Sequence, residues 1–163
     1  MFNIVLVNPQ IHTNTGSIGR MCVNSGCELH LVAPFGFEMD DKHLRRAGLD
    51  YWQKLSPRIY ANLEEFLTQN LQFKERFFFA TTKSNKTLYK AEFQAGDFLF
   101  FGSETSGLPL ELMRLRREGC VSIPMTDAGR SLNLATSVGI VTYEAIRQNL
   151  AKFDFRKNVE EII

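Results

Sequence analysis

Residues that could do chemistry gather at two junctions, each of which combines a strand end, a polar loop and the start of a helix. One junction runs from Ile123-Pro124-Met125 to Arg130-Ser131-Leu132-Asn133-Leu134, and the other runs from Phe98 to Pro109. Open α/β sheets bind ligands in the crevice at the carboxyl ends of their strands. Two adjacent loops of this kind therefore predict a pocket.

Familiar nucleotide-binding and hydrolase motifs do not fit these loops. Gly102 and Gly107 have P-loop spacing, but Leu108 and Pro109 stand where Lys and Ser or Thr would hold phosphate and magnesium. No G-x-G-x-x-G follows the first apolar run, and the loop serines lack the flanking glycines of a nucleophile elbow. These patterns disfavour triphosphatases, dinucleotide enzymes and serine hydrolases.

The cysteines and histidines predict neither a disulfide framework nor a metal site. Cys22, Cys27 and Cys120 are odd in number and sit beside apolar residues, so we interpret them as buried reduced thiols. The histidines are scattered singly, without the i, i+4 spacing of a helical metal site. We expect no metal.

Composition predicts an ordinary globular protein. The chain has 163 residues, 23% charged and 44% hydrophobic, with a formal net charge of +1. We expect a single domain over residues 1–163, with 153–163 as a carboxyl-terminal tail. The small net charge gives no argument for a nucleic-acid partner. No signal peptide or apolar run of membrane-spanning length is present, so we expect a cytoplasmic protein.

Short apolar runs alternate with segments of helical period. The runs are mostly continuous, which is typical of parallel strands covered on both faces. We expect strands at 4–7, 29–33, 77–80, 98–101 and 121–123. The predicted fold class is α/β, a mostly parallel sheet with helices on both faces.

Local signals predict where several helices begin and end. A helix over Asn14–Ser25 should end at Gly26, and Asn62 with Glu65 resembles a capping box. Pro109 fits a first helical turn.

The last long helix, over 134–151, is apolar on more than one face. We expect its own sheet and a partner subunit to cover it.

The only marked charge run, over 40–46, predicts either a solvated turn or a basic patch. Tyr51 and Trp52 follow its cations closely, a combination suited to base stacking beside phosphate contacts.

Three motifs in order resemble those of the SPOUT class of RNA ribose 2′-O-methyltransferases. They are Asn14-Thr15-Gly16-x-Ile18-x-Arg20, Phe101-Gly102-Ser103-Glu104-x-x-Gly107-Leu108, and Ile123-Pro124-Met125 with Arg130-Ser131-Leu132-Asn133-Leu134-Ala135. The likeness extends from Ile4 to about Leu150 and is greatest to the minimal members, which modify cytidine or uridine at tRNA position 34.

The resemblance implies a carboxyl-terminal trefoil knot, S-adenosylmethionine as methyl donor, the tRNA anticodon stem-loop as substrate and a homodimer. General topological rules argue against knots, so the knot is expected from the resemblance alone. The implied cofactor-binding residues are Ala80, Thr81, Gly102, Glu104, Ile123, Met125, Ser131 and Leu132.

The implied catalytic residues are Arg20, Asn133 and Tyr143. Because guanidinium keeps its proton, we expect Arg20 to clamp a phosphate and stabilise negative charge on the attacking oxygen. Asn133 would orient the hydroxyl or the loop. Tyr143 would contact the target nucleotide or lie in the core.

Supporting and RNA-binding roles follow from the same resemblance. Asn14 would cap or brace the first helix and hold Arg20 in register, and Glu104 would contact the cofactor or lock its loop. Arg130 would neutralise phosphate or Glu104. The implied phosphate-binding residues are Lys42, Arg45, Arg46, Lys83 and Arg130.

Two residues depart from the pattern of the wobble-position enzymes. Ser103 replaces a usual proline and Ser106 replaces a usual arginine, which leaves the RNA target open. The alternatives are a ribose methyltransferase of the same class acting on another tRNA position or on rRNA, and a non-catalytic RNA-binding protein with this fold.

Overall fold

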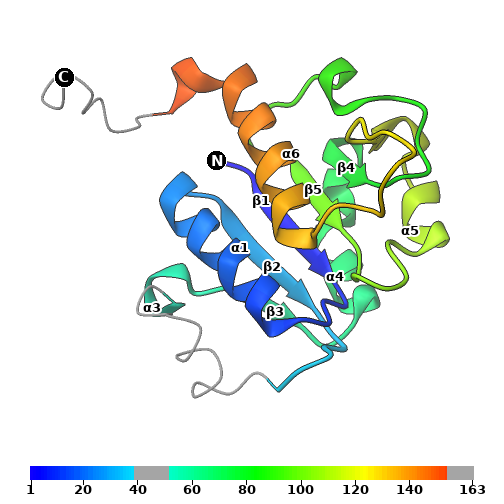
Figure 1. Ribbon diagram of the computed structural model, residues 1–163. Helices are drawn as coiled ribbons and strands as arrows, with labels where there is room; N and C mark the ends of the chain where they lie inside the picture. The colour runs from blue at the N-terminus through cyan, green and yellow to red at the C-terminus, as the bar shows by residue number, and fades with distance from the viewer. Residues whose placement is uncertain (39–51, 154–163) are drawn as a thin grey trace, which may run out of the picture.

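The computed structural model describes residues 1–38 and 52–153 (Figure 1). The strands are β1 (Asn3–Val7), β2 (Glu28–Val32), β3 (Arg58–Tyr60), β4 (Phe77–Ala80), β5 (Phe98–Phe101) and β6 (Cys120–Val121). The α-helices are α1 (His12–Ser25), α3 (Trp52–Leu55), α4 (Leu63–Asn70), α5 (Leu110–Arg114) and α6 (Leu134–Gln148). The 3-10 helices are η1 (Leu71–Arg76), η2 (Leu88–Lys90), η3 (Arg117–Gly119) and η4 (Leu150–Lys152).

The strands form a parallel six-stranded sheet in the order β3-β2-β1-β5-β4-β6. The predicted parallel α/β sheet is therefore confirmed. The chain leaves β1 toward β2 on one side and reaches β5 from the other side through β4. In sheets of this kind, the crevice at such a reversal of strand order is the usual ligand site.

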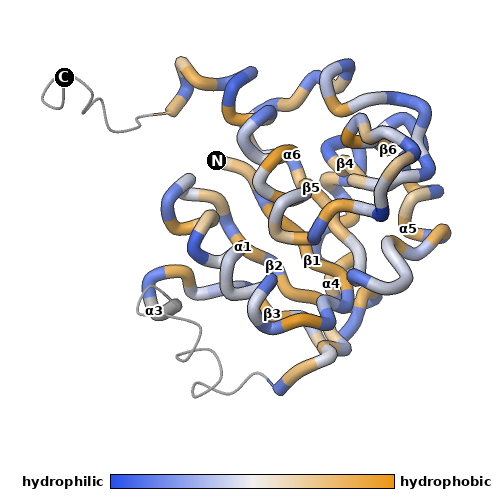
Figure 2. Tube along the Cα trace, in the orientation of Figure 1, coloured by the Kyte–Doolittle hydropathy of each residue, from blue (hydrophilic) through white to orange (hydrophobic). Residues whose placement is uncertain are grey.

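Helices cover both faces of the sheet because its strands are apolar on both faces. Side chains alternate along β1, so that Ile4 and Leu6 join the core under α1 and α6 while Val5 and Val7 join the core under α4 and α5. Figure 2 shows hydrophobic segments running through the strands. This double burial explains why the strands read as continuous apolar runs.

The predicted end of α1 and the predicted start of α4 are confirmed, whereas α1 begins at His12 and not at the predicted Asn14. Helix α1 stops before Gly26, whose φ of +68° is the left-handed conformation that glycine adopts readily. The Asn62 side chain accepts a hydrogen bond from Glu65 N–H at 2.8 Å, and the Glu65 carboxylate accepts one from Ala61 N–H at 2.6 Å. This differs from the usual capping box in one respect: the Glu65 side chain bonds to the N–H of Ala61, one residue before the N-cap residue Asn62.

Other boundaries differ from the sequence prediction. Strand β3 was missed because it is three residues long and its Ile59 is 53% exposed. Pro109 precedes helix α5 as its N-cap, because its ψ of 138° is extended. The last α-helix ends at Gln148, and the predicted end at 151 falls within η4.

Strand β6 begins one residue earlier and ends two residues earlier than predicted, because the chain leaves the β4 ladder after Val121. Ser122 instead accepts a hydrogen bond from Leu88 N–H and donates its own N–H to Lys86 O, each at 2.8 Å. The connection from β4 to β5 therefore passes along the outer side of β6. Such a wrapped arrangement is compatible with the expected trefoil knot, which stays a prediction.

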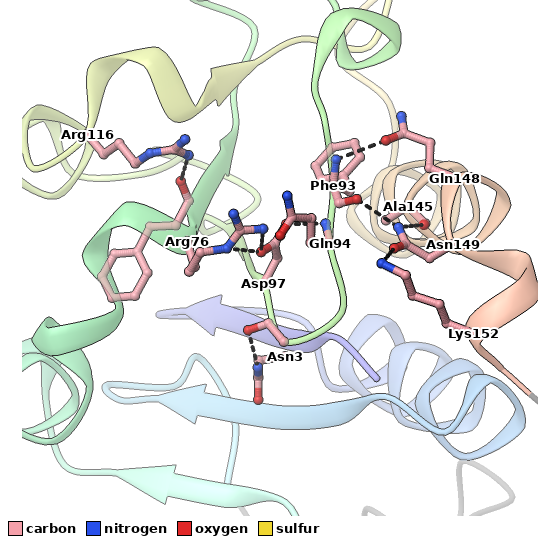
Figure 3. A network of polar contacts seen from close by, with 12 residues as sticks. Asn3, Arg76, Phe93, Gln94, Asp97, Arg116, Ala145, Gln148, Asn149 and Lys152 are labelled. Atoms are coloured by element: carbon pink, nitrogen blue, oxygen red, sulfur yellow. Dashed lines mark hydrogen bonds and ion pairs between the residues drawn. The ribbon is translucent and has the colours of Figure 1, made fainter.

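Polar contacts hold the amino end of the sheet together (Figure 3). Asp97, directly before β5, is fully buried and accepts hydrogen bonds from the Arg76 guanidinium and from Gln94 N–H. Burial raises the pKa of the Asp97 carboxyl, and these donors oppose that shift. Asn3 N–H donates to Asp97 O at 2.9 Å, which ties β1 to β5 at this end.

His30 is buried in the aromatic core beneath α4. Its Nδ1 lies 2.9 Å from the Tyr60 hydroxyl, and its Nε2 lies 3.2 Å from Asn3 Oδ1. Because Asn3 Oδ1 only accepts, these partners fit a neutral ring with its proton on Nε2. Burial, followed by the charge of Arg58, lowers the pKa of His30 to about 4.

We predict that this histidine makes the fold acid-sensitive. Histidine in the unfolded chain has a pKa near 6.5. As the pH falls from about 6.5 to 4, His30 therefore becomes protonated in the unfolded state while it stays neutral in the folded state. The free energy of unfolding then drops by about 3 kcal/mol. Denaturant unfolding of His30→Gln should lack this drop, whereas the exposed-site control His12→Gln should retain it. Equal pH dependence in all three proteins would contradict the assignment.

Candidate active site

The carboxyl ends of β4, β5 and β6 surround a cavity of about 460 Å³. Its walls come from the loops that follow these strands and from the first turns of α1 and α6. The structure therefore brings together the two junctions singled out in the sequence. Every residue that the resemblance assigns to the cofactor lines this cavity: Ala80, Thr81, Gly102, Glu104, Ile123, Met125, Ser131 and Leu132.

The loop after β5 closes tightly on itself. A Cβ atom at Gly102 would overlap the backbone of Gly107 and Leu108, so no larger residue fits without movement. Gly107 has a φ of +69°, in the left-handed region. The Ser103 hydroxyl accepts a hydrogen bond from Ser106 N–H at 3.1 Å and lies 2.9 Å from the Ser106 hydroxyl. The two residues that depart from the family pattern thus bond to each other.

A relay of hydrogen bonds connects the three motifs. One carboxylate oxygen of Glu104 accepts from Gln10 N–H at 2.8 Å, and the other accepts from Asn14 Nδ2 at 2.9 Å. Asn133 Nδ2 then donates to Asn14 Oδ1 at 2.9 Å. Since the three side chains come from α1, the loop after β5 and the start of α6, this relay sets the relative positions of those elements.

Asn133 is the N-cap of helix α6. Its Oδ1 accepts from Ala135 N–H at 2.8 Å and from Thr136 N–H at 3.3 Å, while its Nδ2 is engaged by Asn14. Of the two roles considered for Asn133, these contacts support orienting the loop. Asn14, likewise, braces α1 and does not cap it, because Ile11 is the N-cap residue of that helix.

Two of the residues considered catalytic lie outside the wall of the cavity. Arg20 is exposed on α1, within the helix that Asn14 braces, and does not line the cavity. Tyr143 is 53% exposed on α6 and does not line it either. The alternative that Tyr143 lies in the core is therefore wrong.

The residues predicted to bind RNA phosphate lie in different settings. Lys83 lines the cavity and is exposed. Arg130 is exposed in the loop before α6. Both carboxylate oxygens of Glu104 already accept hydrogen bonds, from Gln10 N–H and from Asn14 Nδ2, so these contacts favour phosphate over Glu104 as the partner of Arg130. Lys42, Arg45 and Arg46 lie outside the described residues, as do the charge run and Tyr51.

Some residues of the site were missed from the sequence. Gln10 was overlooked because its contribution is a backbone N–H, which no side-chain pattern reveals. Ile11 is the N-cap residue of α1, and Met113 and Ser137 lie on α5 and α6, where apolar and small residues usually signal packing. Only the proximity of these helices to the motif loops could have indicated them.

The three cysteines, all within the described residues, are free thiols. Burial raises the pKa of the Cys22 and Cys27 thiols, as expected for buried reduced cysteines, whereas Cys120 is only partly buried, contrary to that expectation. Within 1–38 and 52–153, no group of three or more His, Cys, Asp or Glu side chains is placed to hold a metal ion. Over the same ranges, every helix is too short or too polar to cross a bilayer.

Together the fold and the cavity define an α/β protein that binds a ligand at the carboxyl edge of a parallel sheet. The model of the SpoU rRNA methylase family matches residues 1–143, and the chain belongs to this family.

Known relatives resemble the chain over nearly all of its length. A protein of Saccharophagus degradans named tRNA (cytidine(34)-2′-O)-methyltransferase is 46% identical, with 91% of this chain and 96% of that protein covered. A protein of Yersinia pestis with the same name is 44% identical, with 91% and 94% covered. A solved structure described as giving insights into the 2-OH methylation of C/U34 on tRNA is 40% identical, with a TM-score of 0.84 and 93% and 97% covered.

We predict that Gly102→Ala disrupts the site at the crossing of two backbone segments, where Gly102 packs directly against the backbone of Gly107 and Leu108. The added Cβ must displace the Gly107–Leu108 segment, so the free energy of unfolding should fall by about 3 kcal/mol, while the control Gly129→Ala, which adds a methyl group in open space, should change it by less than about 0.5 kcal/mol. Urea unfolding measures both values. Equal stability of the two variants would show that the crossing is not constrained.

Proposed function

We propose that this chain methylates the ribose 2′-hydroxyl of nucleotide 34, a cytidine or a modified uridine, in tRNA, with S-adenosylmethionine as the methyl donor. The observation that carries the proposal is the convergence of all three motifs on one cavity, joined by the Glu104–Asn14–Asn133 relay. The relatives named for this reaction, at 44% and 46% identity, supply its substrate.

The cavity fits the cofactor in size and in chemistry. A volume of about 460 Å³ suits a nucleoside-sized ligand. Ile123, Leu132 and Leu108 offer apolar walls for a purine, and the Thr81 and Ser131 hydroxyls offer partners for polar groups. The residues that would hold it are Ala80, Thr81, Gly102, Glu104, Ile123, Met125, Ser131 and Leu132. When bound, the sulfonium supplies an electrophilic methyl group, and no metal is needed.

The protein's own contribution is positioning and charge stabilisation. Arg20 would hold an RNA phosphate and stabilise negative charge on the 2′-oxygen as its proton leaves. A guanidinium stays protonated, so it serves as an electrostatic group and not as the base. The relay through Asn14 holds α1, and with it Arg20, at a fixed distance from the cavity.

We also propose a homodimer, in which a partner subunit brings further residues to the site. Along α6, Val138 and Val141 are buried in the core, whereas Ile140 is only partly buried and Tyr143 is 53% exposed. This partly apolar face is where a second subunit would pack, and Tyr143 would then lie near the substrate. Arg20, which does not line the cavity of its own chain, would reach substrate in the same assembly.

The anticodon stem-loop is the proposed RNA element. Lys83 beside the cavity and Arg130 in the neighbouring loop would contact its phosphates, together with Lys42, Arg45 and Arg46. Residues 1–163 would act as a single methyltransferase domain in the cytoplasm, where the tRNA substrate is found.

The target site is tested by methylation of synthetic anticodon stem-loops with a labelled donor. We predict label in the wild-type stem-loop and none in a stem-loop whose nucleotide 34 carries a 2′-deoxy sugar, because the accepting oxygen is then missing. Label on the deoxy substrate would refute position 34. Label on other tRNA positions or on rRNA alone would favour the alternative methyltransferases, and failure of calorimetry to detect S-adenosylmethionine binding would favour the non-catalytic protein.

We predict that Arg20→Lys impairs methyl transfer without weakening the binding of S-adenosylmethionine. Lysine keeps the charge but loses the bidentate geometry, so kcat/KM should fall by about 100-fold or more. The Kd for S-adenosylmethionine, measured by calorimetry, should stay within about twofold because Arg20 does not line the cavity. Arg114→Lys, an exposed arginine on α5, is the matched control and should retain activity. Near-normal turnover of Arg20→Lys would exclude the proposed role.

A further inference from the structure

Three aromatic rings lie beside one another beyond the carboxyl ends of β1 and β2. Phe35 and Phe37, in the loop after β2, are stacked with centroids 5.7 Å apart and planes inclined by 19°. The ring of His12, the first residue of α1, meets Phe37 edge to face at 6.4 Å. We call His12, Phe35 and Phe37 the aromatic ladder.

The packing of the protein accounts for only part of this ladder. Phe35 packs against the core under α1 and α6. Among residues 1–38 and 52–153, Phe37 joins neither hydrophobic core and is partly exposed, and His12 is exposed. The rings of Phe37 and His12, which lie at the surface, suit a partner with flat, weakly polar faces.

Hydrogen bonds connect the ladder to the candidate active site. Gly36 N–H donates to Pro9 O at 3.0 Å, and a Cβ atom at Gly36 would lie only 2.6 Å from Gln10 O. The N–H of Gln10 in turn donates to Glu104, which lines the cavity. The contact surface is therefore formed before any partner arrives, which avoids the entropic cost of ordering it on binding.

The ladder also lies close enough to the cavity to serve the same substrate. His12 directly follows Ile11, which lines the cavity. Strand β1 separates β2 from β5, so the ends of β2 and β5 lie about 10 Å apart at the usual strand spacing. A strand of RNA with one nucleotide at the cavity would place its neighbours near the ladder.

We propose that the aromatic ladder is a stacking platform for an unpaired base of the RNA substrate, next to the nucleotide at the cavity. Unpaired RNA bases stack on phenylalanine and histidine rings, whereas paired bases present no free face. The inference rests on the proposed function, since it takes the modified nucleotide to lie beside the cofactor cavity. It adds a recognition element that the three motifs do not contain.

The test measures binding of a fluorescent anticodon stem-loop by anisotropy. Phe37→Leu keeps apolar volume but removes the flat ring, so the Kd should rise by about tenfold, and Phe37→Trp should restore tight binding. His12→Ala, at an exposed helix start, should weaken binding severalfold without affecting folding. The matched control is Phe73→Leu, because Phe73 is 46% exposed and stacked on Phe98 at 5.7 Å, but lies on η1, directly before the amino end of β4.

A cycle with abasic RNA identifies the stacked base. Removing the base at each unpaired loop position in turn should weaken binding to wild type at one position, and Phe37→Leu should add no further loss there. The inference would be overturned if the loss of affinity from Phe37→Leu added to the loss from base removal at every loop position. It would also be overturned if Phe37→Leu and His12→Ala both kept the RNA affinity of the wild type. A shift of Phe37→Leu to a different oligomeric state in sedimentation would do so too, since a second copy would then cover the ladder.

The two proposals fail in distinguishable ways. If wild type does not methylate the stem-loop, the proposed function is wrong. If wild type methylates it and the ladder variants bind RNA as wild type does, only the stacking platform is excluded.

Discussion

The Glu104 carboxylate is the contact on which the arrangement of the site depends. Its oxygens accept from Gln10 N–H and Asn14 Nδ2, and Asn14 passes the connection on to Asn133. Hydrogen bonds to an ionised acceptor are roughly twice as strong as neutral ones. Because the relay joins residues that are 90 and 119 positions apart, it fixes α1, the loop after β5 and the start of α6 against one another as one wall.

Polar contacts connect the strands at the amino end of the sheet, whereas the candidate site lies at the carboxyl end. At the amino end, buried Asp97 accepts hydrogen bonds from Arg76 and Gln94 N–H with its carboxylate and from Asn3 N–H with its backbone oxygen. At the carboxyl end, the loops surround a cavity and leave Lys83, Met125 and Leu132 accessible. Loops on a rigid scaffold can vary in sequence without loss of the fold, so binding groups are expected at that end.

Much of the fold and of the cavity wall was predictable from short-range signals. Continuous apolar runs predicted the parallel strands, Gly26 predicted the end of α1, and the three motifs named residues that do line one cavity. Strand β3 was not predictable, because a three-residue edge strand with an exposed Ile59 has no periodic pattern. Tyr143 could not be placed either, since a tyrosine on an apolar helix fits the core and the surface equally well.

The sequence by itself determined the fold class, the family resemblance and the identities of the groups around the cavity, because continuous apolar runs, glycine conformation and motif spacing are local properties of the chain. Tertiary structure alone decided that Asn133 caps α6 and bonds to Asn14, that Gln10 contributes through its backbone, and that Phe37 lies at the surface beside His12. These facts depend on strand order and on long-range hydrogen bonds. Neither is encoded in the spacing of neighbouring residues.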